Sequence, residues 1–195
     1  MLAAPIAHFP ASIGAAARAA VDPPQLVIAP AVTYQQYRAC AALVRRMYSW
    51  RGYQISAPPR FDDPNNVMLG IWSDGELVST LTLSRDSGNG LLADNLYPDE
   101  LAHLRKPGTT ICEVTRLAVD VENEGVALLK SLFRAAYQYG RAVFGATDAV
   151  IEVNPRHVRY YRQELGFMPI GELRTCARVG APAVLMHRLV ANLHI

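Results

Sequence analysis

The segment from Ile111 to Val119 contains one carboxylate, Glu113, and one guanidinium, Arg116, in a largely apolar run that predicts a strand. Burial raises the pKa of a carboxylic acid and brings it closer to the range in which it can accept a proton from an ammonium group. A guanidinium can bind a carboxylate through two parallel hydrogen bonds. The two residues could therefore deprotonate an amine and hold a carboxylate, but a structural ion pair between them would explain the same pattern.

A shared site for Glu113 and Arg116 sets a geometric condition. Residues three apart in a regular strand point to opposite faces of a sheet. The two side chains meet only if a β-bulge lies between them, and bulges do occur beside active sites, where they redirect a side chain. Without such a bulge, one of the two residues is structural.

A second group of reactive side chains lies on a predicted helix near the C-terminus. The ends of this helix are marked by an N-cap residue, a first-turn proline and a left-handed glycine: Asn154, Pro155 and Gly166. Adjacent residues of a helix do not share a face, so we expect Tyr160 or Tyr161, but not both, to face a site. His157 could act as a base, although a histidine at a helix start is usually solvated.

The rest of the chain predicts alternating helices and strands. Thr33 suits the N-cap of an amphipathic helix, and Asp74-Gly75 separates two β-prone runs as in a hairpin. The predicted elements are a helix from Thr33 to Trp50, strands Val67–Trp72 and Leu77–Ser84, a helix Pro98–Leu104, a strand Ile111–Val119, a helix Gly125–Tyr139, a strand Ala149–Val153, a helix Pro155–Leu165, and strands Met168–Ala177 and Ala183–Leu189. We interpret residues 1–32, rich in Ala and Pro, as an N-terminal tail, and residues 33–195 as a single α/β domain.

The composition limits the class of protein. With 195 residues, 51% of them hydrophobic, the chain can bury one substantial core. A net charge of +2 and the lack of a known binding motif argue against nucleic acid as a partner. The 3 cysteines are widely spaced, which predicts a reduced, cytoplasmic protein without a metal site. No apolar run approaches the ~20 residues of a membrane-spanning helix, and the start does not resemble a signal peptide.

Two segments carry a family resemblance: ICEVTRLAVD at 111–120 and NPRHVRYY at 154–161. Together they resemble the N-acyl amino acid synthases of the FeeM type, which are GNAT relatives, and the resemblance covers roughly Thr33 to Val190. It implies the GNAT fold, a mixed, mostly antiparallel sheet flanked by helices. It also implies an enzyme that moves a long fatty acyl chain from acyl carrier protein to the α-amine of an amino acid.

The same resemblance assigns roles to residues. Glu113 is the expected base, and Arg116 is expected to hold the acceptor carboxylate or to orient Glu113. Tyr161 is the expected proton donor to the departing thiolate, although it lies one residue further from Phe167 than in the usual GNAT spacing. Cys112 is the nearest nucleophile, but a cysteine in a central strand is usually inert core, so we expect direct attack by the amine.

The turn from Asp120 to Val126 bears on the acyl donor. Acetyl-CoA-dependent GNAT enzymes hold the pyrophosphate on a glycine-rich turn at a helix N-terminus. Here one glycine remains, and three carboxylates stand where the phosphates would lie; each like-charge contact at ~4 Å costs roughly 1–4 kcal/mol. This pattern favours the phosphopantetheine arm of acyl carrier protein as donor, with no permanently bound cofactor, although acidic residues also stabilise a helix start electrostatically.

Basic residues on two predicted helices provide a candidate docking surface for the acidic carrier protein: Lys130, Arg134, Arg156 and Arg159. A solvated face is the simpler explanation. For the acceptor and the acyl chain, we expect contacts from the first helix and from the start of the last one: Tyr34, Tyr37, Val44, Tyr48 and Asn154.

The sequence leaves three alternatives open. An acyl-homoserine lactone synthase would share the E-x-x-R strand and an acidic loop such as Asp62-Asp63. An acetyl-CoA-dependent GNAT N-acetyltransferase would share the fold but is disfavoured by the acidic turn. A degenerate GNAT domain that only binds is the non-enzymatic alternative.

Overall fold

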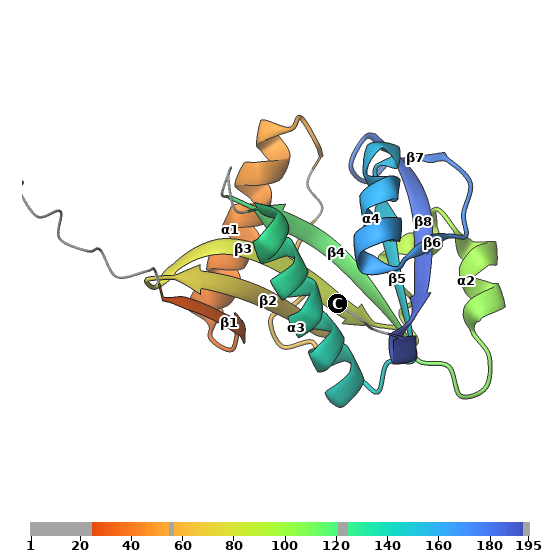
Figure 1. Cartoon of the computed structure of the whole chain (residues 1–195), viewed down its shortest axis with the longest axis horizontal. Helices are drawn as coiled ribbons and strands as arrows, with labels where there is room; N and C mark the ends of the chain where they lie inside the picture. The colour runs from red at the N-terminus through yellow and green to blue at the C-terminus, as the bar shows by residue number, and fades with distance from the viewer. Residues whose placement is uncertain (1–24, 55–56, 121–124, 193–195) are drawn as a thin grey trace, which may run out of the picture.

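The computed structural model describes residues 25–54, 57–120 and 125–192. In these ranges the chain forms an 8-stranded sheet of order β1-β2-β3-β4-β5-β8-β6, with β7 paired to β8. β4 and β5 run parallel, and the other strand pairs are antiparallel. Figure 1 shows α3 and α4 in front of this sheet and α1 behind it. The predicted α/β class with a mixed, mostly antiparallel sheet is confirmed.

The elements follow the predicted order. The strands are β1 Leu26–Pro30, β2 Asn66–Ser73, β3 Glu76–Arg85, β4 Ile111–Val119, β5 Asp148–Val153, β6 Met168–Pro169, β7 Arg174–Cys176 and β8 Ala181–Leu189. The α-helices are α1 Tyr34–Trp50, α2 Pro98–Leu104, α3 Gly125–Ala142 and α4 Val158–Leu165, and short 3-10 helices are η1 Leu92–Asn95, η2 Pro155–His157 and η3 Val190–Asn192.

Local sequence signals explain several of these boundaries. The Thr33 side chain accepts a hydrogen bond from the Gln36 backbone, and the Gln36 side chain accepts one from the Thr33 backbone, which closes a capping box at the start of α1. Asp74 and Gly75 both have positive φ, 50° and 85°, as the two-residue hairpin between β2 and β3 requires. Gly166 ends α4 in the left-handed conformation at φ 67°.

The sheet starts earlier than the sequence pattern indicates. β1 lies inside the segment interpreted as a tail, and it pairs with β2 from Leu26↔Ser73 to Pro30↔Leu69. Its apolar run is short and is followed by a proline, so it does not produce a clear strand pattern. A proline at the end of an edge strand removes no hydrogen bond that the sheet needs.

Two predicted elements are divided in the structure. The predicted helix Pro155–Leu165 starts as a 3-10 turn, because the Asn154 side chain accepts the Arg156 N–H and tightens the first residues. The predicted strand Met168–Ala177 becomes β6 and β7. Between them, Gly171 lies so close to Tyr97 that a Cβ atom would be 2.5 Å from the ring. The chain therefore leaves the sheet here to pass Tyr97.

Apolar side chains fill both sides of the sheet. The larger core lies between the sheet and the helices α3 and α4, and it includes Val114, Leu132 and Tyr161. On the opposite side, α2 packs through Leu101 and α1 through Val44. β4 and β5 lie at the centre of the sheet between these layers, so a gap between these two strands would be lined from both sides.

Candidate active site between strands β4 and β5

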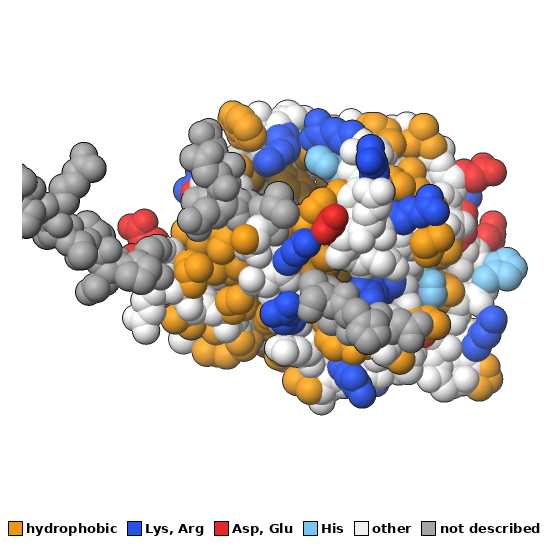
Figure 2. All heavy atoms as spheres, in the orientation of Figure 1, with side chains coloured by type: hydrophobic (Ala, Val, Ile, Leu, Met, Phe, Trp, Pro, Cys, Tyr) orange, Lys and Arg blue, Asp and Glu red, His pale blue; other side chains and the backbone are white. Residues whose placement is uncertain are grey.

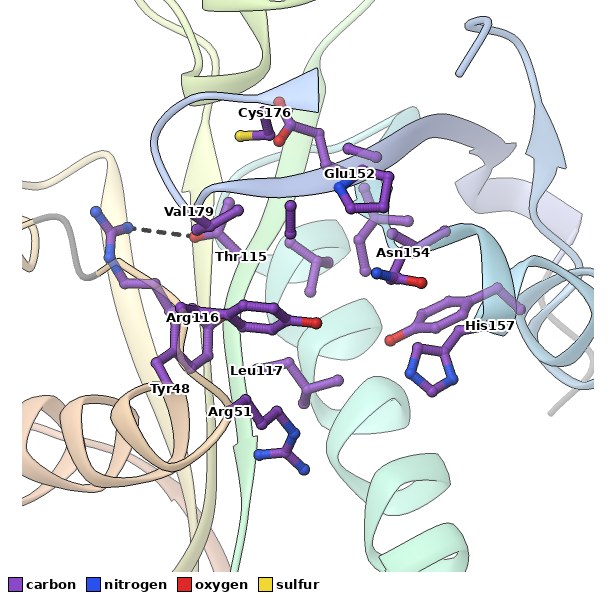
Figure 3. Close-up of a pocket in the computed structure, with 18 of the residues that line it drawn as sticks. Tyr48, Arg51, Thr115, Arg116, Leu117, Glu152, Asn154, His157, Cys176 and Val179 are labelled. Atoms are coloured by element: carbon purple, nitrogen blue, oxygen red, sulfur yellow. Dashed lines mark hydrogen bonds between the residues drawn. The ribbon is translucent and has the colours of Figure 1, made fainter. Parts of the chain in front are cut away.

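The pairing of β4 with β5 ends before the strands do. The parallel register runs from Ile111↔Asp148 to Val114↔Ile151, whereas β4 continues to Val119 and β5 to Val153. A cavity of about 460 Å³ opens where the strands separate. Figure 3 shows labelled residues of β4 and β5 around this space.

Both faces of the sheet contribute to the cavity wall. Leu117 and Val153 belong to the side covered by α3 and α4, where they contact the larger core. Thr115 and Glu152 also line the cavity, and strand alternation directs their side chains to the opposite side. The cavity therefore passes through the gap between the two strands, and a substrate on one side can meet a substrate on the other.

A β-bulge in β4 brings Arg116 to the cavity wall. Thr82 pairs with Thr115 and Thr80 with Ala118, so two residues of β4 stand opposite one residue of β3. Arg116 itself has a positive φ of 51°, which is strained for a residue with a side chain by roughly 1–3 kcal/mol. The bulge that a shared Glu113 and Arg116 site requires is present.

The Arg116 guanidinium is held but not fully paired. It donates to the Ala57 carbonyl at 2.8 Å and to the Thr115 hydroxyl at 3.3 Å. Its Nε atom is buried without a hydrogen-bond partner among the described residues. Burial lowers the pKa of Arg116, although Tyr48 and Glu113 counteract this effect. A half-buried guanidinium with a donor that has no partner is suited to bind an anion.

Glu113 lies next to the cavity but does not line it. The side chain is 0% exposed, and its two oxygens accept the backbone N–H groups of Leu92 at 2.7 Å and Ala93 at 3.1 Å. Burial, followed by repulsion from Glu152, raises the pKa of Glu113 to about 8. These contacts fix η1 against β4, and the role of Glu113 as a base stays a prediction.

Another carboxylate, Glu152, lines the cavity and was not singled out from the sequence. Its Oε2 accepts a hydrogen bond from Arg178 at 2.8 Å, and its Oε1 is buried without a partner among the described residues. Figure 3 shows the Cys176 thiol beside this carboxylate. Burial and Glu152 both raise the pKa of Cys176. The sequence signal that could have identified Glu152 is a charged residue inside the apolar run of β5.

Tyrosines reach the cavity from α1 and from α4. Tyr48 lies near the end of α1, and Tyr161 lies on α4 with its ring packed against Phe133 and Phe167. Burial is the main cause that raises the pKa of Tyr161, and Tyr48 raises it further. Burial also raises the pKa of Tyr48 to about 12, against the effect of Arg116. The neighbouring Tyr160 lines the cavity as well, so the expectation that one tyrosine of the pair, but not both, faces the site is wrong.

The mouth of the cavity is basic. Asn154 caps η2 through its side chain, and Arg156 and His157 follow it along the rim, opposite Arg51 at the end of α1. Figure 2 shows a hollow between α1 and α4, with hydrophobic side chains inside it and Lys, Arg and His side chains on its edge.

The remaining predicted acyl-chain residues lie apart from this cavity. Tyr34 stacks on Tyr37 at 6.0 Å, and both rings contact Phe61. Val44 is buried under α1 and lines a smaller space of about 150 Å³ that also contacts Arg116. Of the expected acyl-chain and acceptor residues, Tyr48 and Asn154 line the main cavity.

The predicted docking residues divide into two groups. Arg156 lies at the cavity mouth, where its Nε donates to His157. Lys130 pairs with Glu164 at 2.7 Å between α3 and α4, and Arg159 donates to Gln163. Arg134 is exposed on α3. The acidic turn after β4 lies largely in residues 121–124, outside the described residues, whereas Asp120 pairs with Arg46.

Within the described ranges, no group of three or more His, Cys, Asp or Glu side chains could hold a metal ion. In the same ranges, no helix combines the length and the apolar character needed to cross a membrane.

Comparisons with known proteins identify the family and the fold. The family model for the N-acyl amino acid synthase FeeM matches residues 39–188. FeeM from uncultured soil microbes has a solved structure that is 26% identical and has a TM-score of 0.79, over 87% of this chain and 94% of that chain. No curated protein sequence matches the chain.

More distant structures share the fold alone. The AHL synthase LasI is 13% identical with a TM-score of 0.60, over 86% of this chain and 91% of that chain. An acyl-CoA N-acyltransferase from Pseudomonas aeruginosa is 17% identical with a TM-score of 0.55, over 85% of this chain and 99% of that chain. The family match covers most of the chain, and the cavity lies inside it: the chain belongs to the N-acyl amino acid synthase FeeM family of GNAT-fold acyltransferases.

Proposed function

We propose that this protein transfers a long fatty acyl chain from acyl carrier protein to the α-amine of an amino acid. The observation that carries the proposal is the half-buried Arg116, which the β4 bulge brings to the wall of a cavity lined from both sides of the sheet. Its Nε has no hydrogen-bond partner among the described residues, and a small side-chain shift toward the cavity would let the guanidinium bind the acceptor carboxylate. Bound there, the amino acid would present its amine to the gap between the strands.

The donor would enter from the side of α3 and α4. Beyond Val114, the edge of β4 no longer pairs with β5, so its backbone N–H groups can face a thioester in the cavity. Such donors stabilise the oxyanion that forms when the amine attacks. Leu117, Leu129 and Val153 give the cavity an apolar wall that suits an acyl chain.

Proton transfers need groups at both ends of the reacting centre. Burial raises the pKa of Tyr161 and keeps the phenol protonated at neutral pH, as a proton donor to the departing thiolate requires. The bond formed is the amide between the amine and the acyl carbon, and the bond broken is the thioester. The amine must also lose a proton, for which Glu113 remains the candidate, and any path from the cavity to its enclosed carboxylate would run through Glu152 or bound water.

Product analysis tests the proposal. The purified protein is incubated with palmitoyl-acyl carrier protein, a mixture of amino acids and S-adenosylmethionine. A parallel reaction contains acetyl-CoA in place of the carrier substrate, and both organic extracts are analysed by mass spectrometry. We expect an N-palmitoyl amino acid. An acyl lactone formed from S-adenosylmethionine, or acetylated amines formed only from acetyl-CoA, would contradict it, and the corresponding Arg116→Gln reaction controls for uncatalysed aminolysis.

A further inference from the structure

Three basic residues from two separate elements line the mouth of the cavity. Arg51 caps the end of α1, and Arg156 and His157 belong to η2. All three line the cavity. The Arg156 Nε donates to the His157 Nε2 at 3.0 Å, and both Arg156 and Arg51 lie close enough to lower the pKa of His157, after burial as the main cause.

Carboxylates do not neutralise this cluster within the described part of the chain. Arg51 donates to the Met47 carbonyl at 3.1 Å and stacks over the Trp50 ring at 5.1 Å, and Arg156 donates to His157. The ion pairs of the described residues involve neither Arg51 nor Arg156. Two unpaired guanidiniums at the entrance of a cavity are a recognisable anion site.

The histidine adds a donor without becoming charged. Because the His157 Nε2 accepts a hydrogen bond from Arg156, its neutral form carries the proton on Nδ1. The cluster therefore presents two guanidiniums and one ring N–H. Planar guanidiniums with additional donors match the oxygens of a phosphate group.

We propose that Arg51, Arg156 and His157 bind the phosphate at the outer end of the donor's phosphopantetheine arm. This inference rests on the proposed function, because it assumes that a pantetheine thioester occupies the cavity. The three basic residues lie at the mouth of the cavity, and the apolar walls lie further in. A donor bound this way would have its phosphate at the mouth and its acyl thioester inside. The same phosphate chemistry occurs in coenzyme A, which carries further phosphates on a nucleotide.

Binding can be measured without turnover, by isothermal titration calorimetry with 4′-phosphopantetheine and with pantetheine. The wild-type protein should bind the phosphorylated compound at least about tenfold more tightly, as one or more charge-assisted hydrogen bonds provide. The double variant Arg51→Gln/Arg156→Gln should bind both compounds equally. Arg38→Gln, an exposed change on the same helix α1 away from the cavity, should keep the preference.

The outcomes separate this inference from the proposed function. Equal binding of the two compounds by the wild-type protein would overturn the phosphate site, even if palmitoyl-acyl carrier protein is a substrate. A preference that survives in the double variant would also overturn it. Coenzyme A as a third ligand distinguishes the sources: similar affinity to 4′-phosphopantetheine supports the carrier-linked arm, whereas a further large gain would assign the site to a nucleotide donor.

Discussion

Glu113 and Arg116 lie on the same side of the sheet, although they are three residues apart in β4. The bulge opposite Leu81 reverses the alternation after Thr115, and the two side chains are close enough for Glu113 to affect the pKa of Arg116. Their surroundings differ. Glu113 is enclosed and bonded to the backbone of η1, whereas Arg116 reaches the cavity. The bulge therefore places the anion-binding group in the site and the carboxylate behind it.

The buried Glu113 should make stability depend on pH. Its pKa is raised from 4.5 to about 8 in the folded protein, so the folded state holds a proton that the unfolded state releases. Stability should therefore fall as the pH rises from about 5 to about 8. Urea unfolding of wild type and Glu113→Gln across this range checks this, since the variant should lose that slope.

An exposed carboxylate supplies the matched control. Glu164→Gln should keep the wild-type slope, because that side chain is 43% exposed and pairs with Lys130 at the surface. If the stability of the wild-type protein and of Glu113→Gln depended on pH in the same way, the prediction would be contradicted. Glu113 would then be ionised in the folded protein, held by the two backbone N–H groups that it accepts.

Tyr161→Phe should lower kcat by about 100-fold, because it removes the expected proton donor to the thiolate. The ring packing on Phe133 and Phe167 is kept, so the melting temperature should change little. Steady-state kinetics with an acyl thioester gives the comparison. Tyr139→Phe, whose ring packs on Phe144 outside the cavity, is the control, and an unchanged kcat for Tyr161→Phe would exclude this role.

Arg159→Glu should weaken the reaction with acyl carrier protein at low salt, with KM rising by about tenfold through lost attraction to the acidic carrier. Lys130→Gln should have a smaller effect, because Glu164 already pairs with Lys130. The difference in KM between Arg159→Glu and the wild-type protein should disappear near 1 M salt, where the screening length is about 3 Å.

A short acyl-pantetheine substrate provides the internal control, since it has no acidic surface. Arg85→Glu, an exposed change at the end of β3, should leave the KM for the carrier substrate unchanged. An identical KM increase for Arg159→Glu with both donors would remove this surface from carrier recognition.

Much of the fold was predictable because its signals are local. The Thr33 capping box, the Asp74-Gly75 hairpin and the left-handed Gly166 are each encoded in a few neighbouring residues. The requirement for a bulge also followed from spacing alone, because strand alternation is strict. β1 was missed, since a strand at the sheet edge depends on pairing with β2 more than on its own short apolar run.

The cavity was less predictable because distant segments form it. Glu152 belongs to β5, whereas its partner Arg178 follows β7. Arg178 donates one hydrogen bond to Glu152 and another to the carbonyl of Leu92 in η1. No local pattern indicates that these residues meet. In the same way, Arg51 and His157 become neighbours only once α1 and η2 pack on opposite sides of the gap between β4 and β5.

Gly171→Ala should destabilise the fold, because its Cβ would lie 2.5 Å from the Tyr97 ring and 2.9 Å from Leu185. Relief needs a backbone or ring shift, which costs roughly 1–3 kcal/mol. Thermal unfolding checks this against Gly88→Ala, where a Cβ meets no atom within 4 Å. Equal melting temperatures would show that the segment between β6 and β7 adjusts freely.

The most direct test compares an amino acid with its amide as acceptor, in wild type and in Arg116→Lys. Arg116 should make the wild-type kcat/KM at least about tenfold higher for the amino acid, as a charge-assisted hydrogen bond provides. Arg116→Lys should lose most of that preference, because an ammonium cannot reproduce the planar donor group. Equal use of the two acceptors by the wild-type protein would contradict the account, since it would show that the cavity binds no acceptor carboxylate.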